Sequence, residues 1–466
     1  MSKKLELLMP AWDFEKLKFA FAYWADAVYV WAPMFSLRAR TNRFTLDTLQ
    51  ESVDYVRSLW TDKKIYFTAN IYAHNIKIKP FMAQFKKMVD MKPDAFIMAD
   101  PGLINLVRKE FPDVEIHLSV QANNTNWAQV QFWKEIGIKR IILSREISIR
   151  EMREIHEQVP DIELEAFVHG AICMAYSGRC LISNYLSSRD PNQGTCSHSC
   201  RWEFKVFKDE KTEAEIETVT WRPEEYEELT GNFYLEERER KGDLMEIDED
   251  EYGTYLMNSR DLCAIDYIKD LTDAGIISFK VEGRNKTVNY LASVGLAYRE
   301  ALDAVEAGRE YDSQKLADQL FSIANRWYIP GFLAGNPWAN AQFYERNGGF
   351  QTKIFLWIVR GYDEEKKMAR VEVKNRFDLG QEIEFISPTK RWIEESKEIY
   401  KILHTNHSRK WGEDFLPSVK FGDDHVEQVE AAHGGSYEVW INAQENPWEF
   451  AIIRKVAQEW EMFTES

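Results

Sequence analysis

Long apolar runs are absent from this sequence of 466 residues, in which 45% of the side chains are hydrophobic. No stretch reaches the roughly 18 consecutive apolar residues that indicate a membrane-spanning helix. The first residues, Met1 to Lys4, lead directly into a strand-like segment, without the apolar core of a secretory signal peptide. We therefore expect a cytoplasmic protein with no membrane partner.

Cysteine is scarce, with five residues in the whole chain, and four of them lie between Cys173 and Cys200. So few thiols in a chain of this length do not form the disulfide framework of a secreted protein. Their clustering indicates metal ligands instead. The fifth, Cys263, lies in a segment with helical character, where we expect it to be a core residue.

The clustered cysteines lack the Cys-x-x-Cys pairs that zinc ribbons usually contain. Four thiolates close a tetrahedral zinc site or hold a 4Fe–4S cluster, and the spacing of six, fifteen and three intervening residues favours the cluster. Zinc and free buried thiols stay as alternatives, and His198 is an alternative ligand. The predicted ligands are Cys173, Cys180, Cys196 and Cys200.

Common hydrolytic motifs are also missing. The sequence contains neither a His-Glu-x-x-His pair for zinc nor a Gly-x-Ser-x-Gly turn for a nucleophilic serine. Ser177 lies among the cysteines, but nothing near it in the sequence marks it as a nucleophile. A peptidase function therefore lacks an identifiable catalytic group.

The net charge of −17 opposes a polyanionic partner only if it is spread over the chain. Between Lys208 and Glu251, eighteen Asp and Glu stand against six Lys and Arg, a net of −12, which leaves −5 for all other residues. The composition of this acidic stretch favours a solvated, partly disordered loop. A local basic surface elsewhere in the chain stays compatible with nucleic-acid binding.

Eight short β-rich runs alternate with longer segments of helical period. This alternation is typical of a (β/α)8 TIM-like barrel, so we predict an α/β fold of that class. The intervening amphipathic segments, such as Phe14 to Ala25 and Ile149 to Gln158, have the length of crossover helices. The predicted strands are Leu5 to Met9, Ala27 to Trp31, Lys64 to Asn70, Ala95 to Ala99, Glu115 to Val120, Arg140 to Ser144, Glu163 to Val168 and Ser278 to Val281.

Three regions are predicted along the chain. Residues 1–310 form the barrel, which a cysteine-rich and acidic insertion interrupts after the seventh strand, at about 170–255. Residues 311–350 link the barrel to a small C-terminal β-barrel domain, 351–466, in which short strands alternate with turns. We expect a helix over Asp261 to Ala274, between the insertion and the eighth strand.

Polar side chains follow the predicted strands, at the end of a barrel where active sites lie. We assign Asn70, Glu146 and His169 as candidate catalytic residues, and Gln121 and Asn123 as candidate substrate ligands. For each of these residues alone, an ordinary hydrogen-bonding role at the barrel mouth is an equally good interpretation.

Three basic residues belong to the same set of strand ends. Arg145, Lys280 and Arg284 are suited to hold an anionic substrate, because guanidinium and ammonium groups bind carboxylates and phosphates.

The cysteine segment, from Glu165-Ala-Phe-Val-His-Gly-Ala-Ile-Cys173 to Tyr-Ser-Gly-Arg-Cys180, resembles the signature of peptidase family U32, the collagenase-like peptidases. Further segments resemble the branch of that family known as prephenate-dependent tRNA uridine hydroxylases, and the resemblance covers nearly the whole chain. These segments are His117 to Asn123, Ile142 to Glu146, Arg189 to Cys196, Cys200 to Glu203, Tyr255 to Asp261 and Lys280 to Arg284.

The resemblance implies an oxygen-independent hydroxylation of tRNA, which makes 5-hydroxyuridine at the wobble position. It also implies prephenate as the cosubstrate and a 4Fe–4S cluster in the barrel mouth. The two carboxylates of prephenate would explain the basic residues at the strand ends. A U32-type peptidase and a noncatalytic scaffold that binds RNA or carries a cluster stay as alternatives.

Tryptophan stands at five positions where the pattern of the resembling family has glycine. An indole adds large bulk where the backbone turns tightly or approaches other backbone, and overpacking costs about 1–3 kcal/mol per site. One cause would explain all five: a source whose genetic code reads UGA as glycine, translated under a code that reads UGA as tryptophan. A divergent protein that repacked around the indoles is the alternative. The positions are Trp12, Trp24, Trp31, Trp327 and Trp357.

The codons of the gene test this explanation. We expect UGA at positions 12, 24, 31, 327 and 357, and UGG at Trp127, Trp202 and Trp440, where tryptophan fits the pattern. Sequencing the gene decides between the two, since UGG at every tryptophan would end the idea.

Overall fold

The computed structural model describes residues 4–37, 43–173, 175–180, 182–187, 189–193, 259–283, 286–335, 349–378, 380–389, 438–443, 445–458 and 461–464. It also describes short strands at 204–209, 217–219, 232–237, 244–247, 249–250, 253–254, 397–398, 402–405, 426–428 and 431–432. Within these ranges, no helix combines the length and the apolar character needed to cross a membrane.

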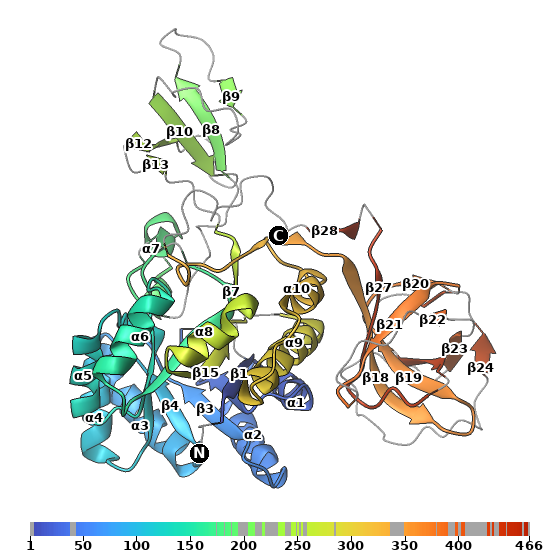
Figure 1. The fold of residues 1–466 in the computed structure, drawn as a ribbon, viewed down its shortest axis with the longest axis horizontal. Helices are drawn as coiled ribbons and strands as arrows, with labels where there is room; N and C mark the ends of the chain where they lie inside the picture. The colour runs from blue at the N-terminus through green and yellow to red at the C-terminus, as the bar shows by residue number, and fades with distance from the viewer. Residues whose placement is uncertain are drawn as a thin grey trace.

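Eight parallel strands close into a barrel, and helices alternate with them along the chain (Figure 1). Each strand pairs with the next, and β15 closes the ring by pairing with both β1 and β7. This arrangement confirms the predicted (β/α)8 fold. The barrel strands are β1 Glu6–Ala11, β2 Ala27–Trp31, β3 Lys64–Thr68, β4 Ala95–Met98, β5 Ile116–Leu118, β6 Arg140–Ile142, β7 Glu163–Ala171 and β15 Ile276–Val281.

Local sequence signals start many of the helices around this barrel. Asp13 caps α1 by accepting a hydrogen bond from the backbone N–H of Lys16, and Ser148 forms a capping box with Glu151 at the start of α6. The helices are α1 Phe14–Ala22, α2 Leu46–Ser58, α3 Asn75–Asp90, α4 Pro101–Glu110, α5 Trp127–Glu135, α6 Ile149–Gln158, α7 Ile182–Ser187, α8 Ile268–Asp273, α9 Val288–Glu306 and α10 Ser313–Phe321. Three-residue 3-10 turns lie at Val120–Ala122, Pro191–Gln193 and Ile265–Tyr267.

After the insertion, the chain departs from the predicted pattern. Strand β14, Asp261–Cys263, runs antiparallel to β7, and β16, Tyr328–Ile329, pairs with β14 on its other side. The predicted helix over Asp261 to Ala274 is therefore wrong in its first half, since α8 begins only at Ile268. Cys263 ends a strand and does not lie inside a helix.

The acidic part of the insertion contains ordered strand pairing, contrary to the loop expected from its composition (Figure 1). Four antiparallel strands form a sheet in the order β11-β10-β8-β9, and β12 pairs with β13. Their bounds are β8 Phe204–Asp209, β9 Glu217–Val219, β10 Asn232–Glu237, β11 Leu244–Ile247, β12 Glu249–Asp250 and β13 Gly253–Thr254.

The C-terminal region folds as an antiparallel β domain around its own hydrophobic core, in which Trp357 is fully buried. The predicted linker before it contains α10 and β16. The central sheet has the order β22-β21-β27-β18-β19-β26-β23-β24. Strand bounds are β17 Gly349–Phe350, β18 Lys353–Asp363, β19 Met368–Val373, β20 Phe377–Asp378, β21 Glu382–Ile386, β22 Lys397–Glu398, β23 Ile402–Thr405, β24 Val426–Gln428, β25 Ala431–Ala432, β26 Glu438–Asn442, β27 Ile452–Val456 and β28 Phe463–Thr464.

Polar contacts join the β domain to the start of the barrel. The hydroxyl of Tyr23 donates to the carbonyl of Ile386 at 2.7 Å, and the indole N–H of Trp24 donates to the carbonyl of Pro388 at 2.8 Å. The end of α1 therefore packs directly on the C-terminal domain.

Four of the nine described non-glycine residues with positive φ are tryptophans, at φ values from 50° to 72°. L-residues rarely adopt this left-handed region, and a large side chain there is an outlier. Two of the five predicted glycine positions, Trp24 and Trp327, belong to this set, and Trp60 and Trp448 join it. The backbone thus marks two positions that the sequence pattern did not.

The setting of Trp24 and Trp60 explains their conformation. Each follows the C-cap of a helix, α1 or α2, at the position where helices commonly end in a left-handed glycine. Gly137, Gly275 and Gly308 occupy the same position after α5, α8 and α9, also with positive φ. Lys92 after α3 has a positive φ as well, so the local geometry at Trp24 and Trp60 favours glycine without requiring it.

Replacing Trp60 by glycine should stabilise the protein. The indole of Trp60 is 94% exposed, so its removal loses little packing, while relief of the left-handed strain gains about 1 kcal/mol. Urea denaturation of Trp60→Gly measures this gain. The control is Trp127→Gly in α5, where glycine is a poor helix former and stability should fall. Equal losses in both variants would contradict a glycine-like site at residue 60.

Candidate functional site

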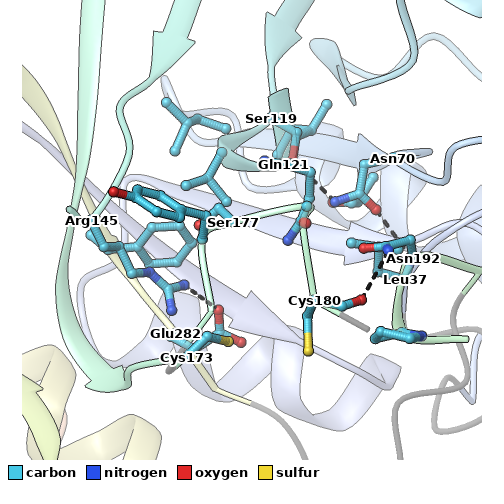
Figure 2. Close-up of a pocket in the computed structure, with 18 of the residues that line it drawn as sticks. Leu37, Asn70, Ser119, Gln121, Arg145, Cys173, Ser177, Cys180, Asn192 and Glu282 are labelled. Carbon is cyan, nitrogen blue, oxygen red and sulfur yellow. Dashed lines mark hydrogen bonds and ion pairs between the residues drawn. The ribbon is translucent and has the colours of Figure 1, made fainter. Parts of the chain in front are cut away.

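A cavity of about 120 Å³ opens where the barrel strands end. It lies between these strand ends and the loop that carries the first two clustered cysteines (Figure 2). Tyr29, Trp31, Phe167 and Tyr176 contribute aromatic walls. The polar and charged lining residues include Asn70, Ser119, Gln121, Arg145, Cys173, Ser177, Cys180, Asn192, Lys280 and Glu282.

The first two predicted metal ligands face this cavity together. Cys173 is exposed and Cys180 is half-buried, and both thiols lie on its lower side in Figure 2. The side-chain amide of Asn192 donates to the carbonyl of Cys180 at 3.2 Å, so the turn Pro191–Gln193 is tied to the segment that carries Cys180. The other two predicted ligands, Cys196 and Cys200, lie outside the described residues.

The cysteine loop is held against two strand ends. The carboxylate of Glu146 accepts a hydrogen bond from the backbone N–H of Ser177 at 3.1 Å. Gly178 approaches the turn after β5 so closely that a Cβ there would lie 2.1 Å from the carbonyl oxygen of Gln121, and its φ is +75°. Only glycine fits this contact. Glu146, predicted as a catalytic residue, thus lies behind the loop as an anchor.

Arg145 lies at the cavity wall with its guanidinium already engaged. It donates to the carbonyl of Ala171 and to the carboxylate of Glu282, both at 2.8 Å, and its guanidinium carbon lies 3.8 Å from the ring centre of Phe167. Burial alone would lower the pKa of Arg145, but the neighbouring carboxylate of Glu282 outweighs it and raises that pKa. The arginine is therefore a fixed cation.

Lys280 forms the floor of the cavity and is buried. Its ammonium donates to Glu165 at 2.9 Å and lies 4.2 Å from the ring centre of Tyr29. Burial lowers the pKa of Lys280, although the charge of Glu165 opposes the shift. The other oxygen of Glu165 accepts from Arg140 and Ser278, so the floor continues into a charged network inside the barrel.

That network crosses the barrel interior. Arg140 donates to Glu6 on β1 and to Glu163 and Glu165 on β7. Burial would raise the pKa of Glu6, but the charge of Arg140 and hydrogen bonds to Glu6 outweigh it and hold that pKa at about 2. Glu6 therefore stays ionised at neutral pH.

The predicted amide ligands have different surroundings. Asn70 accepts from the backbone N–H of Leu37 at 3.2 Å and donates to Ser119 at 3.1 Å, so it joins two strand ends at the cavity wall. Figure 2 shows the side chain of Gln121 extending into the cavity. Asn123 accepts from the hydroxyl of Ser144 at 2.9 Å and does not line the cavity.

His169 points away from the cavity. Its two ring nitrogens each lie 3.3 Å from a tyrosine hydroxyl, Nδ1 from Tyr298 on α9 and Nε2 from Tyr328 on β16. Burial lowers the pKa of His169 to about 3, so the imidazole is neutral. The structure therefore does not bring this predicted catalytic residue to the cavity, and Arg284 lies outside the described residues.

Of two further lining residues, one was within reach of the sequence. Glu282 belongs to the polar residues at the predicted strand ends, although no separate role was assigned to it. Asn192 comes from the insertion, where no strand periodicity predicts which side chains turn back to the barrel mouth.

The protein is a (β/α)8 barrel whose candidate site is built from strand ends and one long insertion. The insertion places a cysteine loop over a cavity of mixed charge. The chain belongs to peptidase family U32. The model of that family matches residues 12–342, and the model of the U32 C-terminal domain matches residues 351–454.

Relatives within this family carry more specific names. The chain is 45% identical to tRNA hydroxylation protein P of Haemophilus influenzae over 399 residues, covering 83% of this chain and 86% of that protein. It is 45% identical over 397 residues to tRNA hydroxylation protein P of Escherichia coli, with the same coverage. It is also 30% identical to the 23S rRNA 5-hydroxycytidine C2501 synthase of Escherichia coli, over 65% of this chain and 40% of that protein.

Breaking the buried pair at the cavity floor should destabilise the fold. Glu165→Gln leaves the ammonium of Lys280 buried without its carboxylate, which typically costs about 3–5 kcal/mol. Adding Lys280→Met to this variant should restore part of the loss, because it removes the uncompensated charge. Urea denaturation at pH 7 measures both changes. An unfolding free energy in Glu165→Gln equal to that of the parent would show that the pair carries no such role.

Proposed function

We propose that this protein is a tRNA-modifying hydroxylase that adds a hydroxyl group at C5 of the wobble uridine. The observation that carries this proposal is the 45% identity to two tRNA hydroxylation proteins over 83% of the chain. The rRNA 5-hydroxycytidine synthase supports hydroxylation at C5, since it is named for a pyrimidine that carries this group. The barrel-mouth cavity with aromatic walls is a suitable place for a pyrimidine ring.

We also propose that Cys173, Cys180, Cys196 and Cys200 hold a 4Fe–4S cluster. Two of these thiols face one cavity from one loop, as ligands of a single group should, and four cysteines suit such a cluster. The cluster, when bound, would supply an iron site for electron transfer or for binding an oxygen atom of a substrate. The loop anchors, Glu146 and Gly178, hold the thiols at the barrel mouth.

Prephenate is the proposed cosubstrate. Arg145 and Lys280 bring two cationic groups to the cavity, each paired with a carboxylate, Glu282 and Glu165, and we propose that a carboxylate of the cosubstrate binds beside these pairs. The fixed guanidinium of Arg145 can orient such a carboxylate, because its donors lie in one plane. The side-chain amide of Gln121 can donate or accept a hydrogen bond inside the same cavity.

A peptidase gains no support from the cavity. Ser177 lies in its wall, but no histidine stands among the described lining residues to activate a serine. The neutral His169 points away from the cavity and belongs to a separate cluster with Tyr298 and Tyr328.

Mass spectrometry of tRNA nucleosides tests the proposed reaction. Cells that lack the gene should lose 5-hydroxyuridine and its derivatives from tRNA, and the gene in trans should restore them. Blocking the synthesis of prephenate in cells that keep the gene should lower the same nucleosides. Unchanged 5-hydroxyuridine in the deletion strain would contradict the hydroxylase proposal. A loss in the deletion strain but not in the cells without prephenate would show that prephenate is not the cosubstrate.

Metal analysis tests the proposed cluster. Protein purified without oxygen should contain about four iron and four sulfide per chain, with the broad absorbance of thiolate-ligated clusters near about 400 nm. Cys180→Ala should lose this iron. The matched control is Cys263→Ala, because Cys263 is half-buried beside Tyr298 and does not line the cavity. Stoichiometric zinc without sulfide, or equal iron loss in both variants, would contradict the ligand set.

A further inference from the structure

His169 does not line the cavity, although its place in the sequence predicts the inward face of β7. Glu165 and Phe167 point into the barrel, and His169 shares their parity. The pairing of β7 with β15 shifts at this point: Phe167 pairs with Lys280, and His169 pairs with the next residue, Val281. Val168 is the extra residue of a β-bulge, which turns His169 outward towards α9.

The hydrogen bonds around His169 assign its tautomer. Tyr298 donates its single hydroxyl proton to the carbonyl of Val168 at 2.7 Å and accepts from the backbone N–H of Ala264 at 3.2 Å. Towards Nδ1 of His169 it can therefore only accept, so Nδ1 carries the proton. Nε2 is then an acceptor, and the hydroxyl of Tyr328 lies 3.3 Å both from it and from the carbonyl of Leu320, so these two acceptors share one proton. The neutral state of this buried imidazole agrees with the assignment.

Hydrogen bonds hold the backbone between His169 and the cysteine loop at three carbonyls. The carbonyl of His169 accepts from the backbone N–H of Glu282 at 2.8 Å, that of Ala171 from Arg145 at 2.8 Å, and that of Ile172 from the hydroxyl of Ser259 at 2.8 Å. Cys173 is the next residue. These hydrogen bonds hold the backbone in one conformation from the bulge at Val168 to Cys173.

Gly170 packs so closely against the carbonyl of Glu282 that this part of the backbone has no room to shift towards it. Its φ is +105°, and a Cβ there would lie 2.4 Å from the carbonyl oxygen of Glu282. That same carbonyl accepts from the hydroxyl of Tyr290 at 2.6 Å. Tyr290 and Tyr298 are eight residues apart on α9, slightly more than two turns, so one face of this helix supports both sides of the strand end.

We propose that His169 is a positioning residue, which fixes the strand end that presents Cys173 through its hydrogen bonds to Tyr298 and Tyr328. The proposal deepens the proposed function and rests on it for the role of Cys173 as a cluster ligand. The imidazole bridges two tyrosine hydroxyls, each of which also bonds a backbone carbonyl, of Val168 or of Leu320, and this bridge keeps the bulge closed. His169 acts through the backbone and touches no group in the cavity.

Three variants separate positioning from simple packing. His169→Phe keeps a ring but removes both hydrogen-bonding nitrogens, and Tyr328→Phe removes only the hydroxyl that faces Nε2. His169→Asn is the conservative rescue, because its amide N–H can still donate to Tyr298. Should His169→Phe fail to fold, Tyr328→Phe provides the same comparison at unchanged volume.

Hydrogen exchange on the metal-free protein gives a readout that needs no cluster. We expect amides of 164–173 and 278–283 to exchange about fivefold faster in His169→Phe and Tyr328→Phe, the opening expected from one lost hydrogen bond, and at the parent rate in His169→Asn. Helix α2 is the internal reference and should not change. Equal rates in all variants, or a parallel rise in α2, would overturn the proposal.

Iron content of the loaded protein gives the second readout. Per folded chain, iron and sulfide should fall by about half or more in His169→Phe and stay near the parent value in His169→Asn. Iron at the parent level in His169→Phe, with a lower melting temperature, would assign His169 to packing alone and overturn the proposal. A parent protein without iron would defeat the cluster assignment, while the exchange rates would still decide whether His169 holds the strand end.

Discussion

The guanidinium of Arg140 is the contact on which the barrel depends. It is buried inside the ring of strands and binds carboxylates on β1 and β7, one of which, Glu165, also holds Lys280 on β15. Charges this deep are tolerable only when each has partners, so the strands that carry them must stay in register. A slip of one residue along β7 would turn Glu165 out of the barrel and leave two buried cations without it.

The two ends of this charged network have different roles. At Arg140 and Glu6 the charges are paired with one another and stabilise the barrel. At Lys280 the network forms the floor of the cavity. The side chains above that floor fall into groups with different tasks. Asn70 and Glu146 hold loops and strand ends, while Gln121, Arg145 and Glu282 present polar groups to the cavity. Strand-end residues in this barrel are thus as often supports as they are contacts for a ligand.

The sequence predicted the barrel because its strands are buried on both faces and appear as short apolar runs between amphipathic helices. It also put the start of the cysteine loop at the barrel mouth, since Cys173 follows closely on the seventh strand, which ends at Ala171. The direction of single side chains was harder to predict. His169 keeps the parity of an inward residue, and only the bulge at Val168, which leaves no mark in composition or period, turns it outward. Asn123 does not line the cavity, because its left-handed backbone conformation directs its side chain to Ser144.

Tryptophan at left-handed helix ends bears on how the gene of this protein is decoded. If residue 12 is encoded by UGA, a ribosome that treats this triplet as a stop signal releases only an eleven-residue peptide, and no part of the barrel is made. A ribosome that inserts tryptophan completes the chain but places an indole at Trp24 and Trp60, at the position where α5, α8 and α9 of the same barrel are followed by glycine. A backbone dihedral angle can therefore carry information about translation, because it shows which side chain a position was shaped to hold.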